Sequence, residues 1–459
     1  MRSRALVLIA LAVAGGIAGL LSYSGVQGEP PAAPRELPPD LRDSQPQSEP
    51  AVPAVQPTTG SNTPSPAKAA ERPRAPGPID RFRNFNALPP VTQQMLLSAQ
   101  AGIEWLHRMN QPSGRFLHGY VPALNQPMEG DHFLRQTTAA FVLARAARFT
   151  GEERHAVRAA QAILSLLAET KIDPVAPGMR MPTAPSVICN RLAGAGYLVM
   201  AIHELPEPTT ELLARSDELC AFIRAQQRTD GSLHYTDKAD ENEAQTDPEG
   251  INHYPGPALY GVALSQRHRP APWKAELIRK SFVYYYNWFR AHPHPELVPW
   301  LTAAYGEAFL QTKEAAYADF VCGMNDWLVK LQYDQLDPRH PDWRGGFRDA
   351  SVRGADTMPT IETALYAQSL ADCCRVIRQM PNPDTSRYER CRTALVRALQ
   401  FTTTLQFAEG NTQHFAPNYR PMLVGGFHAS PRDGNLRVDQ SAHAISALIG
   451  FLMSGAERE

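Results

Sequence analysis

Asn435-Leu-Arg-Val-Asp-Gln-Ser-Ala-His-Ala-Ile-Ser-Ala-Leu-Ile-Gly-Phe451, a stretch near the end of the chain, starts with polar residues and continues with small and apolar ones. A helix that is apolar on most faces is a buried helix. Asp439 and His443 are four residues apart, so they share one face near the first turn. The stretch therefore predicts a buried helix with a functional site at its amino end.

The same kind of segment recurs from residue 90 onward, each time after an amphipathic partner. The amphipathic segments mix charged and apolar residues at three- and four-residue spacing, as surface helices do: Thr92–Met109, Glu152–Glu169, Thr210–Gln227, Trp273–Arg290, Lys313–Gln332 and Ser386–Gln406. The apolar partners are Phe133–Phe149, Val187–Glu204, Tyr254–Gln266, Val298–Leu310, Thr360–Arg378 and Val438–Met453. The pair repeats about six times with a period of roughly 50–60 residues, which indicates a repeat architecture.

The connections alternate in length and share a beginning. Links that lead from an apolar to an amphipathic segment are short, whereas most links in the other direction are long. Long links in compact domains are usually functional or disordered, and here they would emerge where the apolar helices begin. Several of them start with a Gln, then a Gly that allows the chain to turn, then an aromatic or aliphatic residue, as in Gln226–Leu233, Gln332–Phe347 and Gln406–Phe427.

This Gln, Gly and Phe or Leu pattern, together with the paired helices, resembles the α/α toroid superfamily. That superfamily includes terpenoid cyclases, protein prenyltransferases and six-hairpin glycosidases, epimerases and polysaccharide lyases. The resemblance covers residues from about 90 to 455 and implies an all-α, (α/α)6-type toroid of about six inner and outer hairpins over residues 90–459. It also implies a ligand site at the amino ends of the inner helices, where aligned helix ends favour anions in any case.

Two carboxylates are the leading candidates for chemistry at that end. Glycoside hydrolysis needs a pair of carboxyl groups, one as acid and one as base or nucleophile. Glu362 and Asp439 are among the few charges in otherwise apolar helices. Alternatively, each caps backbone amides or pairs with an arginine such as Arg437, because acids are favoured at helix starts. Asp131, at the start of the first apolar segment, is a further candidate for substrate binding.

His253 and Tyr254 suit a different reaction. Epimerases and uronate lyases move a proton beside a carboxylate, using His, Tyr or Lys as the base. Arg135 and Arg437 could hold the acid group of such a substrate. Alternatively, Tyr254-Pro-Gly simply begins the third apolar helix, with Pro in its first turn.

Metal chemistry has less support. Asp439 and His443 with His253 or His132 would offer suitable ligand types, but Asp-x-x-x-His spacing is common on helices. We therefore expect His443 to be a packed residue oriented by Asp439 that also borders the substrate. The Asp-x-Asp-Asp acid of squalene-type cyclases is absent from the sequence. We expect no metal and no cofactor.

Aromatic residues are the remaining site candidates, because sugar rings stack on aromatic faces. Trp300 and Trp343 are the residues we expect to contact a ligand, whereas Phe347 and Phe427 read as plugs of their loops. The six cysteines, at positions 189, 220, 322, 373, 374 and 391, form no Cys-x-x-Cys pair. Cys391 with Cys373 or Cys374 could form a disulfide, and buried free thiols are an equal alternative.

The amino-terminal part has a different character. Arg2 and Arg4 precede an uncharged run from Ala5 to Leu21, which predicts an export signal or a signal anchor over residues 1–24. Residues 25–89 are rich in Pro, Ala and Ser and predict a disordered linker. We therefore expect a periplasmic or extracellular protein, in contact with the membrane only if the signal is not cleaved.

The composition and the repeated helical pattern leave two alternative functions for the protein. Lys+Arg 45 against Asp+Glu 46 provides no basic field for nucleic acid. The first function is an exported carbohydrate-active enzyme, a glycan hydrolase, lyase or epimerase. The second is a non-catalytic toroid that binds glycan or peptide as an envelope scaffold.

Overall fold

A computed structural model describes residues 77–236, 243–350, 352 and 356–458, and in these residues long helices alternate between two environments. The outer set is α1 (Pro90–Met109), α3 (Glu153–Leu167), α5 (Thr210–Ala225), α9 (Pro272–Ala291), α11 (Ala315–Leu328) and α13 (Thr385–Thr404). The inner set is α2 (Phe133–Thr150), α4 (Arg191–Glu204), α8 (Pro255–His268), α10 (Leu297–Thr312), α12 (Thr363–Gln379) and α15 (Val438–Ser454).

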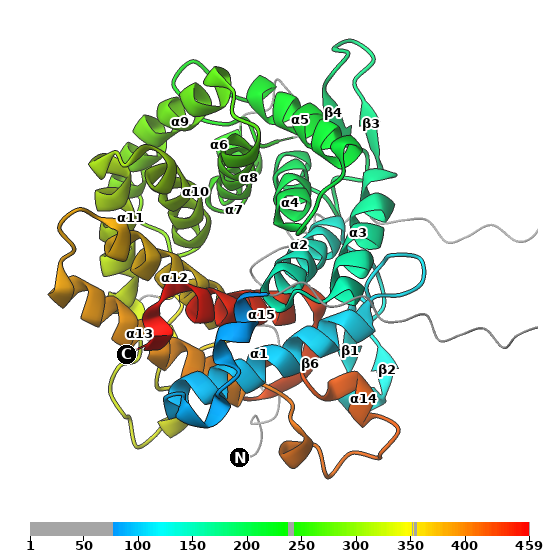
Figure 1. Cartoon of the computed structure of the whole chain (residues 1–459), viewed down its shortest axis with the longest axis vertical. Coiled ribbons are helices and arrows are strands. Elements are labelled where there is room, and N and C mark those ends of the chain that lie inside the picture. Colours follow the sequence, from blue (N-terminus) through cyan, green and yellow to red (C-terminus); the bar gives the residue numbers. More distant parts are fainter. Residues whose placement is uncertain (1–76, 237–242, 351, 353–355, 459) are drawn as a thin grey trace, which may run out of the picture. The chain divides into compact units, whose positions relative to one another are not determined.

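The inner helices form a closed ring. Each packs against the next along the chain, and α15 packs against α2, so that the first and last inner helices are neighbours. Figure 1 shows this ring at the centre, with the outer helices wrapped around it. The chain therefore folds as an (α/α)6 toroid, as the pattern of the sequence predicted.

Side-chain burial explains which helix belongs to which ring. Every residue of α10 from Leu297 to Phe309 is buried, because both faces of an inner helix meet other helices. In α9 the buried positions, such as Leu277, Ser281, Tyr285 and Phe289, recur every three or four residues along one face. Close packing between α4 and α8 depends on Gly196, where a Cβ atom would overlap with the backbone of Ala258.

The loops that follow four of the outer helices repeat one turn. Isolated β-bridges join Asn110 to Phe116, Gln227 to Leu233, Gln332 to Phe347 and Gln406 to Phe427. In the last of these loops, Gly425 has φ +97°, and a Cβ atom would overlap with the carbonyl oxygen of Ala101 on α1. The side chain of Gln406 also reaches α1 and donates to the carbonyl oxygen of Ser98 at 3.0 Å. The repeated turn thus attaches each of these loops to a neighbouring outer helix, and its last copy closes the ring.

Short strands and helices complete the connections. Strands β1 (Gly119–Val121), β2 (Gln126–Pro127), β5 (His428–Ser430) and β6 (Asp433–Arg437) form an antiparallel sheet in the order β2-β1-β6-β5. Gly119 pairs with Arg437 in this sheet, so the loop before α2 lies beside the start of α15. Strands β3 (Thr170–Ile172) and β4 (Arg180–Pro182) form a separate hairpin, and the short helices are α6 (Glu243–Thr246), α7 (Gly250–His253) and α14 (Arg420–Leu423).

The start of the folded region differs from the prediction. Residues 78–82 and 85–87, which the sequence analysis assigned to the disordered linker, form short 3-10 helices. Phe82 is buried and packs against Phe149 at 6.5 Å between ring centroids, and Arg81 forms an ion pair with Glu457 at 2.9 Å. These two contacts attach residues 81 and 82 to the toroid. The predicted export segment, residues 1–24, lies outside the described residues.

The cysteines are buried free thiols in the structure. Cys374 on α12 and Cys391 on α13 have their Sγ atoms 3.5 Å apart, so adjacent helices carry this pair as expected. Within the described part of the chain, no helix is both long and apolar enough to cross a membrane.

Candidate functional site

The amino end of the inner ring gathers two groups of ionisable residues. The first group comes from α2, α15 and the sheet beside them. Asp439, in the first turn of α15, accepts two hydrogen bonds from Arg437, at 3.1 Å and 2.6 Å. Arg135 on α2 approaches the same carboxylate at 3.8 Å and lies 2.7 Å from Nε2 of His118. Two parts of the chain that are far apart in sequence, α2 and the junction of β6 with α15, therefore meet at one carboxylate.

The electrostatics of this first group fix its protonation. Burial opposes ionisation of Asp439, but the guanidinium groups of Arg437 and Arg135 lower its pKa to about 2. Burial lowers the pKa of His443 to about 4, so its imidazole is neutral at pH 7. Burial and the charge of Arg135 lower the pKa of His132 to about 4 as well. The group thus presents an ionised carboxylate, two cationic guanidinium groups and neutral imidazoles.

The second group comes from the starts of α8, α10 and α12. Nε2 of His253 lies 2.8 Å from a carboxylate oxygen of Glu296, the residue before α10. Burial lowers the pKa of His253, but the hydrogen bond and the charge of Glu296 outweigh it and raise the pKa overall. Glu362 immediately precedes α12. Burial and the charge of Glu296 raise the pKa of Glu362, with Arg437 acting in the opposite direction.

Glu362 combines two properties that seldom occur together. Its side chain is exposed to solvent, yet enough protein surrounds the carboxyl group to raise its pKa. A carboxyl group that a ligand can reach and whose pKa is raised is better suited to act as a general acid than an ordinary carboxyl group. Because Arg437 influences both Glu362 and Asp439, the two groups of residues belong to one electrostatic environment.

The other candidates from the sequence lie in several places. Tyr254 lies at the start of α8, with its ring 6.0 Å from that of His253. Asp131 is half exposed, accepts from Gln136 at 2.8 Å and pairs with Arg115. Trp300 is 4 % exposed and packs edge-on against Tyr197 and His443. Its ring is therefore packed among other side chains next to the ionisable groups.

Trp343 does not join these residues. It is 9 % exposed and stacks on His340, with 3.9 Å between ring centroids, inside its own loop. Neither Glu296 nor His118 was given a role from the sequence. His118 lies in a long loop before an inner helix, which is the signal that could have drawn attention to it.

The potential metal ligands Asp439, His443, His253 and His132 do not converge. In the part of the chain that the structure describes, the side chains with three potential ligand atoms within 4.8 Å of one another are those of Glu104, Glu152 and His155. These residues belong to α1 and the start of α3.

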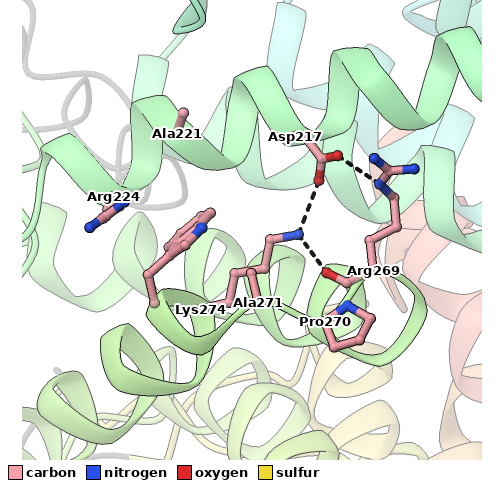
Figure 2. Close-up of a pocket in the computed structure, with 8 residues that line it drawn as sticks. Asp217, Ala221, Arg224, Arg269, Pro270, Ala271 and Lys274 are labelled. Atoms are coloured by element: carbon pink, nitrogen blue, oxygen red, sulfur yellow. Dashed lines mark hydrogen bonds and ion pairs between the residues drawn. The ribbon is translucent and has the colours of Figure 1, made fainter.

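A cavity lies between two of the outer helices. Between α5 and α9 this cavity of about 600 Å³ is lined by Asp217, Arg224, Arg269, Trp273 and Lys274 among others (Figure 2). Asp217 pairs with Arg269 at 2.6 Å and with Lys274 at 3.0 Å. Its carboxylate is thus fully engaged, and the arrangement offers no acid and base pair for catalysis.

The fold of this chain, an α/α toroid, is shared by several solved structures of other proteins. Among solved structures, D-mannose isomerase is similar with a TM-score of 0.58 and 10% identity, over 80% of this chain and 99% of that one. The unsaturated glucuronyl hydrolase from Bacillus sp. GL1 is similar with a TM-score of 0.55 and 14% identity, over 80% and 98%. The alpha-1,6-mannanase GH76A of Salegentibacter sp. HEL1_6 has a TM-score of 0.52 and 10% identity, over 77% and 98%.

At such identities the similarity establishes the fold, and it leaves the chemistry to be argued from this chain's own residues. No protein-family model matches the sequence. No curated protein matches it either.

Proposed function

We propose that the amino end of the inner ring is the active site of an enzyme that hydrolyses glycans. The observation that carries this proposal is the environment of Glu362: an exposed carboxyl group whose pKa is raised by burial and by Glu296. The similar structures named above include two glycan hydrolases, which makes this chemistry compatible with the fold.

In the proposed reaction Glu362 donates its proton to the glycosidic oxygen, and the bond from that oxygen to the anomeric carbon breaks. The carboxylate of Glu296, oriented by His253, is the second group of the pair. It either takes a proton from the attacking water or attacks the anomeric carbon itself. Glu296 suits this role better than Asp439, because both oxygens of Asp439 already accept from Arg437.

Asp439 is then a positioning residue. Its carboxylate holds Arg437 and approaches Arg135, and two guanidinium groups side by side favour a substrate that carries a negative charge or several hydroxyl groups. We expect Asp439→Asn to raise KM more than it lowers kcat, because the groups that bind the substrate lose their orientation while the acid remains.

The test is turnover on a panel of neutral and acidic oligosaccharides. We expect Glu362→Gln to lower kcat/KM by about 10²–10⁴, the usual contribution of general acid catalysis, and Glu296→Gln to do the same. Glu276→Gln, which removes an exposed carboxylate from α9, should leave the rate unchanged. Full activity of both site variants would refute the assignment.

An aldose–ketose isomerase or epimerase is the second candidate. It is favoured by the bond between His253 and Glu296, since a histidine with a raised pKa can hold and return a proton beside a sugar carbonyl. The D-mannose isomerase shares this fold. Incorporation of solvent deuterium into monosaccharides, lost in His253→Asn, would favour this reaction over hydrolysis.

A non-catalytic envelope scaffold is the remaining alternative. Binding of an oligosaccharide without turnover by any member of the panel would favour it. We also propose that the protein is exported, on the basis of Arg2, Arg4 and the apolar run after them. The intact mass of the protein from its native cells tests this, because cleavage around residues 24–28 or retention in the membrane fraction is expected. Full-length protein in the cytosolic fraction would contradict export.

A further inference from the structure

A second cluster of carboxylate and imidazole side chains lies where outer helix α1 meets the start of α3. Glu104 and His107 are three residues apart on α1, and Glu152 and His155 are three residues apart at the start of α3. Glu-x-x-His is the spacing with which helices present a carboxylate and an imidazole to the same metal ion. One oxygen of Glu104, one of Glu152 and a nitrogen of His155 lie within 4.8 Å of one another.

The hydrogen bonds of Thr150 determine which nitrogen of His155 carries a hydrogen. The single hydroxyl hydrogen of Thr150 is donated to the carbonyl oxygen of Ala146 at 2.9 Å. With that hydrogen donated to Ala146, the contact of 3.0 Å between this hydroxyl and Nδ1 of His155 is a hydrogen bond that Nδ1 donates. Metal-binding histidines are commonly held in this way, by a hydrogen bond from the nitrogen that does not bind the metal.

The other nitrogen of His155 is directed at the carboxylates. Nε2 lies 3.4 Å from Glu104 and 4.0 Å from Glu152. The side chain of His155 is 0 % exposed, and Nε2 makes no hydrogen bond. With Nδ1 carrying the hydrogen, a neutral imidazole directs the lone pair of Nε2 at negatively charged oxygens, an unfavourable contact that a cation between them would relieve.

The spacing suits a small divalent ion. Tetrahedral Zn²⁺ with bonds of about 2.0–2.1 Å holds its ligand atoms roughly 3.4 Å apart. The pair of Glu104 and His155 already has this separation, and Glu152 needs only a small movement. Nδ1 of His107 is also buried without a hydrogen-bond partner, and its ring centroid is 5.3 Å from that of His155, so His107 can supply a fourth ligand once its side chain moves closer to the other three.

A positively charged side chain, that of Arg154, already contacts the two carboxylates. Arg154 donates to Glu152 at 2.6 Å and to Glu104 at 2.9 Å. Its side chain is 48 % exposed, so the guanidinium can move into solvent. We propose that Glu104, Glu152 and His155, with His107, form a binding site for a divalent transition-metal ion of the Zn²⁺ type, which exchanges with Arg154 and ties α1 to α3. This site is separate from the proposed active site and does not depend on its function.

The test is a Zn²⁺ titration of the full chain after treatment with a chelator, read by competition with a chromophoric chelator. We expect one Zn²⁺ per chain. Glu104→Gln and His155→Gln should each weaken binding at least tenfold, since each loses a ligand. Arg154→Ala should bind more tightly, because it removes the competing cation. Glu276→Gln, which breaks an exposed ion pair that lacks a histidine, should bind as the native chain does.

Two results would overturn the proposal. One is the absence of Zn²⁺ binding by both the native chain and Arg154→Ala, a variant whose exposed position spares the fold. The other is unchanged affinity in the Glu104 and His155 variants, which would place the ion elsewhere, for instance at the buried cysteines. Circular dichroism checks that the variants fold, and the visible spectrum of bound Co²⁺ should show the loss of the imidazole ligand in His155→Gln.

Discussion

Glu362 and Asp439 lie at the same end of the inner ring, and their carboxyl groups have opposite surroundings. Asp439 faces two guanidinium groups, whereas Glu362 is partly enclosed by protein and close to the charge of Glu296. Two carboxyl groups whose pKa values are displaced in opposite directions can take different roles in one reaction. In the proposed mechanism Asp439 is the anion that holds the arginines, and Glu362 is the proton donor.

This assignment predicts the pH dependence of activity. A general acid works only while protonated, so kcat/KM falls as the pH rises through its pKa. Asp349 is exposed, and its charge contributes to the raised pKa of Glu362. We expect Asp349→Asn to move the alkaline limb of the profile to lower pH.

Arg437 provides the opposite control. Its positive charge lowers the pKa of Glu362, so Arg437→Gln should move the alkaline limb to higher pH. The measurement is kcat/KM over a pH series on the best substrate of the panel. A limb that stays in place in both variants would mean that a group other than Glu362 supplies the proton.

At the scale of helices and loops, the turn that ends the last outer helix makes a testable contribution to stability. The amide of Gln406 donates to the carbonyl oxygens of Ser98 and Gly425, and the Ser98 hydroxyl donates to Gln406. All three bonds are buried. Gln406→Ala should lower the free energy of unfolding by about 2–4 kcal/mol, because buried groups lose their partners.

A matched control lies between the same two helices. Gln94 on α1 donates to Thr403 on α13 in an exposed hydrogen bond, so Gln94→Ala should cost much less. Urea unfolding measures both variants. Equal losses would mean that the turn of Gln406 has no special part in closing the ring.

The helices and this turn could be predicted from the sequence, because both leave local signals. The buried helix at the end of the chain begins at Val438 as predicted, and the predicted segment Thr210–Gln227 corresponds to α5. The sheet of β1 and β6 could not be predicted, since strands of three to five residues have too little alternation to be recognised.

Which residues contact one another in the candidate site also could not be predicted from the sequence. The sequence placed Glu362 and His253 at the amino ends of predicted inner helices, but distances between helices depend on how the ring closes. Val187–Glu204 was expected to start earlier than α4, which begins at Arg191 after the cap by Asn190. Local spacing sets which face a residue occupies, and tertiary packing then decides which residue it meets.

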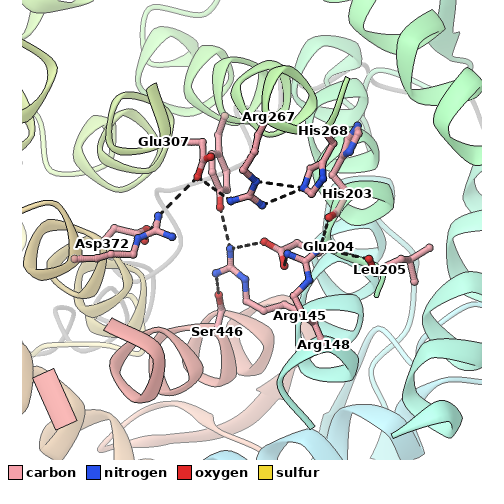
Figure 3. A network of polar contacts seen from close by, with 12 residues as sticks. Arg145, Arg148, His203, Glu204, Leu205, Arg267, His268, Glu307, Asp372 and Ser446 are labelled. Carbon is pink, nitrogen blue, oxygen red and sulfur yellow. Dashed lines mark hydrogen bonds and ion pairs between the residues drawn. The ribbon is translucent and has the colours of Figure 1, made fainter. Parts of the chain in front are cut away.

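At the scale of the whole ring, a network of charges crosses the carboxyl half of the inner helices. Arg145 on α2 donates to Glu204 on α4, to Tyr260 on α8 and to Ser446 on α15 (Figure 3). Glu307 on α10 pairs with Arg267 and approaches Arg375 on α12. All six inner helices take part. The network explains why otherwise apolar helices carry charged residues.

Glu204 makes the network sensitive to acid. Burial opposes its ionisation, but Arg145 and Arg148 lower its pKa below the ordinary value of 4.5. Its contribution to stability is therefore complete above pH 4.5 and is lost as the pH falls through the lowered pKa. We expect Glu204→Gln to lower the free energy of unfolding by about 3–5 kcal/mol near pH 7, because it leaves buried arginines unpaired.

This difference between Glu204→Gln and the native chain should shrink in acid. Urea unfolding over a pH series measures it, with Glu211→Gln, which removes an exposed carboxylate, as the control. A difference that is the same at all pH values would show that the carboxylate of Glu204 carries no charge in the native state.

The contact of the last loop with the first helix has a consequence for synthesis. Gly425 and Gln406 pack on α1, and Asp439 joins Arg135 from α2. A growing chain can build hairpins in order, yet these contacts can form only after the final stretch has been made. Until then the surfaces of α1 and α2 that these contacts cover are exposed. A chaperone that binds unfolded chains would therefore encounter these surfaces first. A fragment that lacks the final hairpin should therefore have neither a closed ring nor an assembled site.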